Sequence, residues 1–203
     1  MITSSNYKKV FSTFKRYYIP IPLEIFKKDP YKTLISTLLS SRTRDEVTLI
    51  ASNKLFNKAT NINKLNQLSQ LEFRNLIYPV GFYKTKAKHL KKLAESIVDE
   101  HEGKIPQTRE ELMKLPGVGR KTANLVLNRA FGIPAIAVDT HVHRISNMLG
   151  WVKTKSPEQT EKELNKIVPK KYWSDMNRLF VSIGRQFRTT KKLEEFLNKE
   201  KLV

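Results

Sequence analysis

Residues 110–123 read Glu-Glu-Leu-Met-Lys-Leu-Pro-Gly-Val-Gly-Arg-Lys-Thr-Ala. This pattern predicts two helices joined by a tight turn over residues 115–119. The glycines of the turn, Gly117 and Gly119, permit positive φ angles and leave the backbone uncovered. Amides placed there, beside a helix N-terminus, favour a phosphate group, and we expect Val118 to pack inward and keep the turn rigid. The same residues also fit an ordinary helical hairpin, so the pattern alone leaves both interpretations open.

The composition favours the phosphate-binding interpretation. The chain of 203 residues has 38 Lys and Arg against 19 Asp and Glu, a formal net charge of +19. Such an excess predicts an acidic partner: nucleic acid, an anionic membrane or an acidic protein. In so basic a chain, the turn at 115–119 is expected to bind a DNA backbone without reading bases. No apolar run approaches the ~20 residues of a membrane span, so we expect an intracellular protein of the cytoplasm or nucleoid with no membrane partner.

The sequence contains no cysteine. Its absence excludes disulfide bonds, thiolate zinc sites, a thiolate nucleophile and any iron–sulfur cluster held by thiolates. Two histidines, His141 and His143, lack the i, i+4 spacing of a metal pair on a helix. We therefore expect neither a metal nor a cofactor.

Apolar residues recur at helical spacing through most of the chain. Only residues 133–138 resemble a strand, and they are too few to build a sheet, so the predicted fold class is all-α. The first segment, Met1–Pro22, is basic and free of acids like a transit peptide, but Val10, Phe11 and Phe14 at helical spacing favour a folded helix that is not cleaved. Further helices are expected over residues 31–39, 43–56, 62–68, 69–77, 85–100, 121–131, 140–149, 156–167, 172–188 and 191–199.

Two motifs point to one family. Residues 115–127, together with Ala-Val-Asp-Thr-His-Val-His-Arg at 137–144, resemble the helix-hairpin-helix DNA glycosylase superfamily. Within it the sequence is most similar to endonuclease III, and the similarity extends to residues 29–45 and to Val-Gly-Phe-Tyr-Lys-Thr-Lys-Ala at 80–87. The combined pattern covers most of the chain.

The resemblance implies a two-lobed helical fold with a central cleft. Residues 30–133 are expected to form a helical barrel module that contains the hairpin, and residues 1–29 and 134–203 a second lobe built from both chain ends. The implied activity is base-excision repair of double-stranded DNA by a monomer, which removes oxidised pyrimidines such as thymine glycol and cleaves abasic sites by β-elimination. Two alternatives stay open: a mismatch-thymine or oxidised-purine glycosylase, and a non-catalytic helix-hairpin-helix DNA-binding module.

The resemblance also implies a catalytic pair. It places the family's Schiff-base lysine on Lys121, in the first turn after the hairpin, where a helix N-terminus and Arg120 both disfavour the ammonium form and so favour a nucleophilic amine. It places the family's aspartate on Asp139, where a carboxylate could take a proton from the amine and stabilise positive charge on the sugar. From the residues alone, Lys121 could equally be an exposed surface lysine and Asp139 a helix N-cap.

Two further positions match residues that fill the gap left by a flipped base. Arg42 matches the position where the best-known relatives carry a glutamine, and Phe82 matches a wedge position that is commonly leucine. A phenylalanine can stack between bases, whereas the arginine adds charge and hydrogen-bond donors. The alternatives are a surface arginine and a core phenylalanine.

The sequence departs from the family after Arg185. Relatives usually continue into four cysteines that hold a [4Fe–4S] cluster, and residues 191–203 contain none. Leu193, Phe196 and Leu197 are spaced as the apolar stripe of a short helix that could dock where the cluster loop would lie. A lysine-rich run, which we interpret as the solvated face of a helix, is formed by Lys84, Lys86, Lys88, Lys91 and Lys92.

Overall fold

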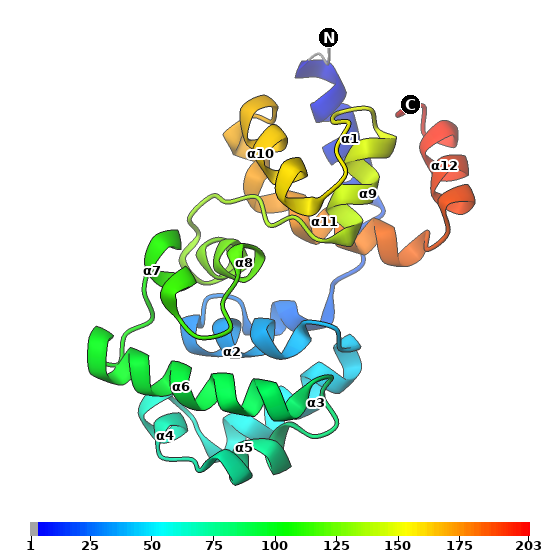
Figure 1. Ribbon diagram of the computed structural model, residues 1–203. Helices are drawn as coiled ribbons and strands as arrows, with labels where there is room; N and C mark the ends of the chain where they lie inside the picture. Colours follow the sequence, from blue (N-terminus) through cyan, green and yellow to red (C-terminus); the bar gives the residue numbers. More distant parts are fainter. Residues whose placement is uncertain (1–3) are drawn as a thin grey trace. The chain divides into compact units, whose positions relative to one another are not determined.

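The computed structural model describes residues 4–203, whose helices are shown in Figure 1. These residues form helices and irregular connections without a strand, which confirms the all-α class. Within the same range, no helix is long and apolar enough to cross a membrane. The expected N-terminal helix, α1, runs from Ser4 to Arg16. The segment compared with a transit peptide also includes residues 1–3, which lie outside the described residues.

The described chain forms two compact units. We call residues 22–133 the hairpin unit, and residues 4–21 with 134–203 the terminal unit. The elements of the hairpin unit are η1 (Pro22–Phe26), α2 (Pro30–Ser40), α3 (Asp45–Lys58), α4 (Ile62–Asn66), α5 (Gln70–Ile77), α6 (Tyr83–His101), α7 (Arg109–Lys114) and α8 (Arg120–Phe131).

Helix α2 is the centre of the hairpin unit, and most of its side chains are buried. It contacts α3, α6 and α8, while α4 and α5 pack against α6 (Figure 1). Its start follows the predicted signal: Asp29 accepts a hydrogen bond from Lys32 N at 2.9 Å, and Pro30 occupies the first turn. Proline is well placed there because a first-turn N–H has no intrahelical partner.

The boundary of the hairpin unit lies before Pro22, so residues 22–29 belong to this unit and not to the lobe formed by the chain ends. The reason is packing. The Phe26 ring lies 5.1 Å from that of Phe56 on α3, and the Phe26 carbonyl accepts a bond from Thr33 Oγ1 at 2.7 Å. The ring contact connects residues far apart in sequence, so no local signal announces it.

The terminal unit contains α1, α9 (Thr140–Met148), α10 (Pro157–Ile167), η2 (Lys170–Tyr172), α11 (Trp173–Gln186) and α12 (Thr190–Lys199). Its core is rich in aromatic rings contributed by both ends of the chain. Phe14 on α1 is fully buried between Phe180 and Phe196, with ring centroids 5.1 and 6.3 Å away. Phe11 stacks on Tyr172 at 4.4 Å. Helix α1 is therefore an integral part of this core.

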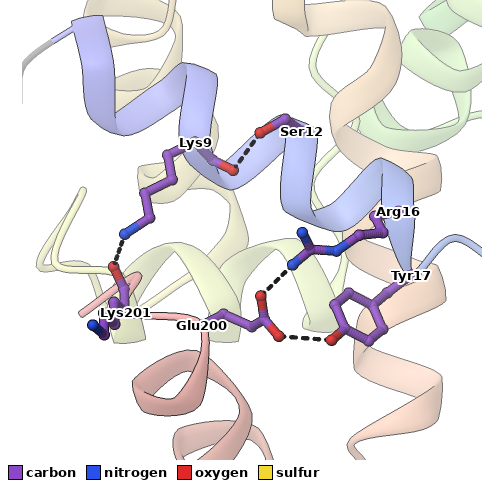
Figure 2. A network of polar contacts seen from close by, with 6 residues as sticks. All are labelled: Lys9, Ser12, Arg16, Tyr17, Glu200 and Lys201. Atoms are coloured by element: carbon purple, nitrogen blue, oxygen red, sulfur yellow. Dashed lines mark hydrogen bonds and ion pairs between the residues drawn. The ribbon is translucent and has the colours of Figure 1, made fainter.

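Polar contacts also join α1 to the residues after α12 (Figure 2). Lys9 Nζ donates to the carbonyl of Lys201 at 2.6 Å. The Glu200 carboxylate pairs with Arg16 and accepts a hydrogen bond from Tyr17 Oη at 2.6 Å. That hydrogen bond to a carboxylate raises the pKa of Tyr17, because it stabilises the protonated phenol.

Helix α12 carries the apolar stripe that the sequence predicts. Leu193, Phe196 and Leu197 are all buried. The Phe196 ring lies 4.2 Å from Phe187, which follows α11, and 5.1 Å from Tyr17, which follows α1. The helix is thus held by hydrophobic packing as well as by the Glu200 contacts.

Truncating the α12 stripe should destabilise the terminal unit. Leu197→Ala removes a fully buried side chain and is expected to cost about 2–5 kcal/mol of unfolding free energy. Urea unfolding followed by circular dichroism measures it. Glu194→Ala, an exposed change on the same helix, is expected to stay within about 0.5 kcal/mol. Equal, small effects for both variants would show that α12 does not contribute to the core.

Candidate active site

The predicted hairpin forms between α7 and α8. Val118 N donates to the carbonyl of Leu115 at 3.0 Å, and both side chains are buried, as expected for a rigid turn. Gly117 has a φ of +81°, and a Cβ at this position would lie 2.9 Å from His89 Nδ1 on α6. Both the backbone conformation and the close approach of His89 therefore require glycine at position 117.

Gly119 acts differently from Gly117. The sequence suggests positive φ at both glycines, but Gly119 has a φ of −93° and forms the N-cap of α8. No atom lies within 4 Å of the point where its Cβ would be, so a ligand has room to approach this backbone. A glycine N-cap also offers no side-chain acceptor to the first amides of the helix. The turn therefore combines open backbone with a helix N-terminus, the arrangement that suits a phosphate.

A basic groove extends from the turn along the hairpin unit. It has a volume of about 660 Å³ and includes Pro116 and Gly117 in its lining. The remaining lining residues come from α5 and α6, and none of those described is acidic: Gln70, Arg74, Lys84, Thr85, Lys88, His89 and Lys92. The groove therefore places cationic side chains beside the turn.

Lys121 is exposed. It is the second residue of α8, which begins at Arg120 after the Gly119 N-cap. The following residues of the helix, Ala123 to Leu127, are all buried, and α8 contacts α2. The lysine is thus held on a rigid helix next to the turn. Its side chain remains accessible.

Asp139 is the N-cap of α9 in the terminal unit. Its Oδ1 accepts hydrogen bonds from His141 N and Val142 N, each at 2.9 Å, so the capping interpretation is confirmed. Oδ2 takes no part in those two bonds. Lys121 lies in the hairpin unit and Asp139 in the terminal unit.

Residues 133–138, which resemble a strand in sequence, form no strand. They run as an irregular segment whose residues 135–138 are buried in the terminal unit. Asn177 on α11 donates to the carbonyl of Ala137 at 2.9 Å and fixes the approach to Asp139. The apolar residues are explained by burial, which strands and buried irregular segments share.

Close packing also fixes the first turn of α9. A Cβ on Gly184 of α11 would lie 2.2 Å from His141 Nδ1, so the imidazole lies directly on the glycine backbone. The other histidine, His143, contacts Thr160 Oγ1 at 2.6 Å. Among residues 4–203, no cluster of three histidine, aspartate or glutamate side chains is arranged to bind a metal.

Arg42 and Phe82 are brought together in the hairpin unit. Both have left-handed backbones, with φ angles of 52° and 58°, a conformation that costs about 1–2 kcal/mol for a residue with a side chain. Phe82 is 61% exposed, which excludes the core interpretation. The Arg42 guanidinium carbon lies 5.4 Å from the centre of the Phe82 ring. An exposed cation and an exposed ring therefore form one stacked pair on two strained turns.

Lys86 is the residue that the sequence interpretation missed. That interpretation puts it on a solvated face, but its side chain is buried and only 8% exposed. Burial lowers the pKa of Lys86 to about 8, so the ammonium form still predominates at neutral pH. The signal is present in the sequence, because position 86 continues the buried i, i+4, i+7 stripe of Leu90 and Leu93.

The residues after α11 do not fit the [4Fe–4S] cluster that the resemblance implies. The chain has no cysteine to supply thiolates, and α12 fills this region with the packed side chains of Leu193, Phe196 and Leu197. The Gly119 cap that precedes Lys121 and the capping bonds of Asp139 involve residues well before 188. The candidate site is thus built without the cluster.

Comparison with known proteins agrees with this architecture. Residues 35–170 match the model of the HhH-GPD superfamily of base excision DNA repair proteins, which covers the hairpin, the basic groove, Lys121 and Asp139. Individual relatives within this superfamily show which of its families the chain belongs to.

Endonuclease III of Thermotoga maritima is 49% identical over 158 residues, 78% of this chain and 74% of that protein. Endonuclease III-like protein 1 of Bos taurus is 42% identical over 159 residues, but the aligned part is only 52% of its length. Two solved structures, of a non-covalent endonuclease III–DNA complex and of a trapped endonuclease III–DNA covalent intermediate, match with TM-scores of 0.84 and 0.81, at 35% and 33% identity. Each match covers 94% of this chain and 90% of the other. The chain belongs to the endonuclease III family.

The basic groove should contribute to DNA affinity through charge. Lys88→Gln and Lys92→Gln each remove a cation that lines it, and each is expected to reduce the slope of log K against log salt by about one for duplex DNA. Fluorescence anisotropy with a labelled duplex at several salt concentrations measures the slope. Lys64→Gln, which removes an exposed lysine of α4 outside the groove, is the control. Equal slopes for all three variants would place the DNA elsewhere.

Proposed function

We propose that the protein is a bifunctional DNA glycosylase and abasic-site lyase. It removes oxidised pyrimidines such as thymine glycol from duplex DNA and then cleaves the strand by β-elimination, with no metal or cofactor. The observation that carries the proposal is Lys121, an exposed lysine in the first turn of α8, directly after the turn suited to a phosphate. In a chain of the endonuclease III family, that placement offers an amine to the sugar next to the bound phosphate.

The proposed chemistry needs a nucleophile and a proton acceptor. The neutral Lys121 amine attacks the anomeric carbon of the sugar, and the glycosidic bond breaks as the damaged base leaves. The negative charge of Asp139 first stabilises the cationic sugar as the base leaves with the bonding electron pair. The carboxylate then accepts the proton that the attached amine releases, and the anionic base takes up a proton from water. The capping bonds hold Oδ1 of Asp139, so the carboxylate is oriented before the substrate arrives.

Strand cleavage follows from the same lysine. Opening of the sugar ring gives an imine between Lys121 and the former anomeric carbon. The imine acidifies the adjacent C2′–H, and loss of that proton expels the 3′ phosphate. Water then hydrolyses the imine and frees the amine. An endonuclease III has been captured in a trapped covalent intermediate with DNA, which supports a covalent route for this chain.

Arg42 and Phe82 are proposed to enter the duplex when the damaged base flips out. The exposed ring can stack between bases, and the guanidinium beside it offers donors to the orphaned partner base. Flipping costs a few kcal/mol, least for a base that pairs badly, and side chains that fill the gap offset that cost. The turn at Gly117–Gly119 and its buried Val118 are proposed to hold the backbone meanwhile.

Covalent trapping tests the role of Lys121. Borohydride reduction of the imine should give a protein–DNA adduct with duplexes that carry thymine glycol or an abasic site. Lys121→Gln should abolish it, because glutamine has no nucleophilic amine, while Lys64→Gln should retain it. An adduct that survives in Lys121→Gln would assign the reaction to another amine.

If binding is intact and no adduct forms, the lyase proposal is wrong. Release of free base without strand cleavage would then indicate a monofunctional glycosylase, and no release a DNA-binding module. A panel with mismatched thymine and oxidised purines ranks the lesions within the same experiment.

The two roles of Asp139 can be separated by substitution. Asparagine caps a helix about as well as aspartate, so Asp139→Asn should change the unfolding free energy by less than about 0.5 kcal/mol. It removes the negative charge, so base excision should fall by about 10²-fold or more. Asp139→Ala should lose the cap as well and cost about 1 kcal/mol of stability. Single-turnover excision and urea unfolding measure the two effects. Excision unchanged in Asp139→Asn would leave only the capping role.

A further inference from the structure

Lys86 makes an unusual set of contacts for a lysine in a basic run. Its buried Nζ donates to the carbonyl of Leu39 at 2.8 Å, to the carbonyl of Ser41 at 2.6 Å and to Thr43 Oγ1 at 3.2 Å. An ammonium group has three N–H donors. All three are used, and all three acceptors belong to one short segment, the end of α2 and the turn that carries Arg42.

The end of α2 explains why a cation is favourable there. The last carbonyls of a helix have no intrahelical partner and carry the negative end of the helix dipole. The helix ends at Ser40, and Ser41 already has an extended backbone. The buried ammonium binds a carbonyl before the last helical residue, Ser40, and a carbonyl after it. It therefore fixes the end of α2 and the backbone direction of the following turn.

The hydroxyl of Thr43 connects this segment to the second turn. Thr43 Oγ1 accepts from Lys86 Nζ and also from the backbone N–H of Gly81 at 3.1 Å. The two backbones are nearly in contact, because a Cβ on Gly81 would lie 2.4 Å from the carbonyl oxygen of Arg42. Phe82 follows Gly81 directly and caps the start of α6, the helix that carries Lys86.

One side chain thus connects the two turns that present Arg42 and Phe82. We propose that Lys86 is a positioning residue for base flipping: its ammonium locks the Arg42 turn against the Phe82 turn, so that the guanidinium and the ring enter DNA as a single preformed wedge. The inference rests on the proposed function, because it assumes that these two side chains enter the duplex. Preformation matters because a side chain that is already ordered loses less conformational entropy on binding.

The experiment must detect insertion of the Arg42 and Phe82 side chains into DNA without depending on catalysis. We choose a duplex in which a tetrahydrofuran abasic analogue, which the lyase cannot cleave, lies opposite 2-aminopurine. Insertion beside that base changes its stacking and therefore its fluorescence. Wild-type protein at saturating concentration should give a large change, and Phe82→Ala, which removes the ring, should lose most of it.

Three variants separate positioning from other effects. Lys86→Met keeps an unbranched side chain, one atom shorter, without the donors of Nζ and should lose most of the fluorescence change. Gly81→Ala should do the same with Lys86 intact, because the new Cβ pushes the turns apart. The control is Lys91→Met, from the same helix, whose Nζ donates to the carbonyl of Asn66 at 2.7 Å, away from both turns. It should behave as wild type. Circular dichroism melting establishes that each variant is folded.

The absence of cysteine allows a chemical rescue at this position. Lys86→Cys has a single thiol, which can be alkylated in urea and the protein refolded. Aminoethylation rebuilds an ammonium at the position of Nζ, whereas a neutral propyl thioether fills the same space without donors. The ammonium adduct should restore the fluorescence change and the neutral adduct should not.

The outcomes distinguish this inference from the proposed function. On duplex thymine glycol, Lys86→Met should excise about ten-fold more slowly or worse, as expected for the loss of a charge-assisted hydrogen bond. Rescue by the neutral adduct, or a full fluorescence change in folded Lys86→Met, overturns the positioning role. So does a wild-type protein that binds the duplex without any change. If the wild-type protein gives the fluorescence change but forms no borohydride-trapped adduct, the lyase proposal is wrong and the positioning role of Lys86 is still supported.

Discussion

An all-helical chain leaves several N–H groups and several carbonyl groups without intrahelical partners at the two ends of every helix. Three such ends carry the candidate functional residues. Asp139 accepts from two amides of the first turn of α9, and Lys86 donates to the carbonyl of Leu39 in the last turn of α2. Gly119, at the start of α8, offers no side chain at all. Charged side chains bind the first two ends, whereas the start of α8 has no capping side chain and open space beside Gly119.

Local signals in the sequence are enough for the helices, the hairpin and the cap at Asp139, because each depends on residues a few positions apart. Such signals fail where distant packing decides the outcome. Residues 22–29 join the hairpin unit through Phe26, and residues 133–138 are apolar because the terminal unit buries most of them. Gly119 has a negative φ and open space around it, so the positive φ that its sequence permits is not used. Lys86 is misjudged from sequence because its charge outweighs its position on the buried stripe of α6, and its partners lie more than forty residues earlier.

The family resemblance implies a cluster that this chain cannot hold, and the structure shows what occupies the same stretch of sequence. Helix α12 packs three apolar side chains into the aromatic core, and the residues after it bind α1. A metal cluster joins its ligands through a few strong bonds, whereas the packing of α12 depends on many weak contacts. Such packing requires no cofactor delivery and depends on neither iron supply nor oxidation state.

The pairing of α1 with residues 200 and 201 also has a consequence for the order of folding during synthesis. The hairpin unit is a continuous stretch, so all of its contacts are available once residue 133 has left the ribosome. The core of the terminal unit joins Phe14 to Phe196, and Lys9 binds the carbonyl of Lys201. Helix α1 is made before the hairpin unit, so its aromatic side chains stay uncovered until α11 and α12 have also been made. Chaperones that bind exposed apolar segments have that interval in which to act on α1.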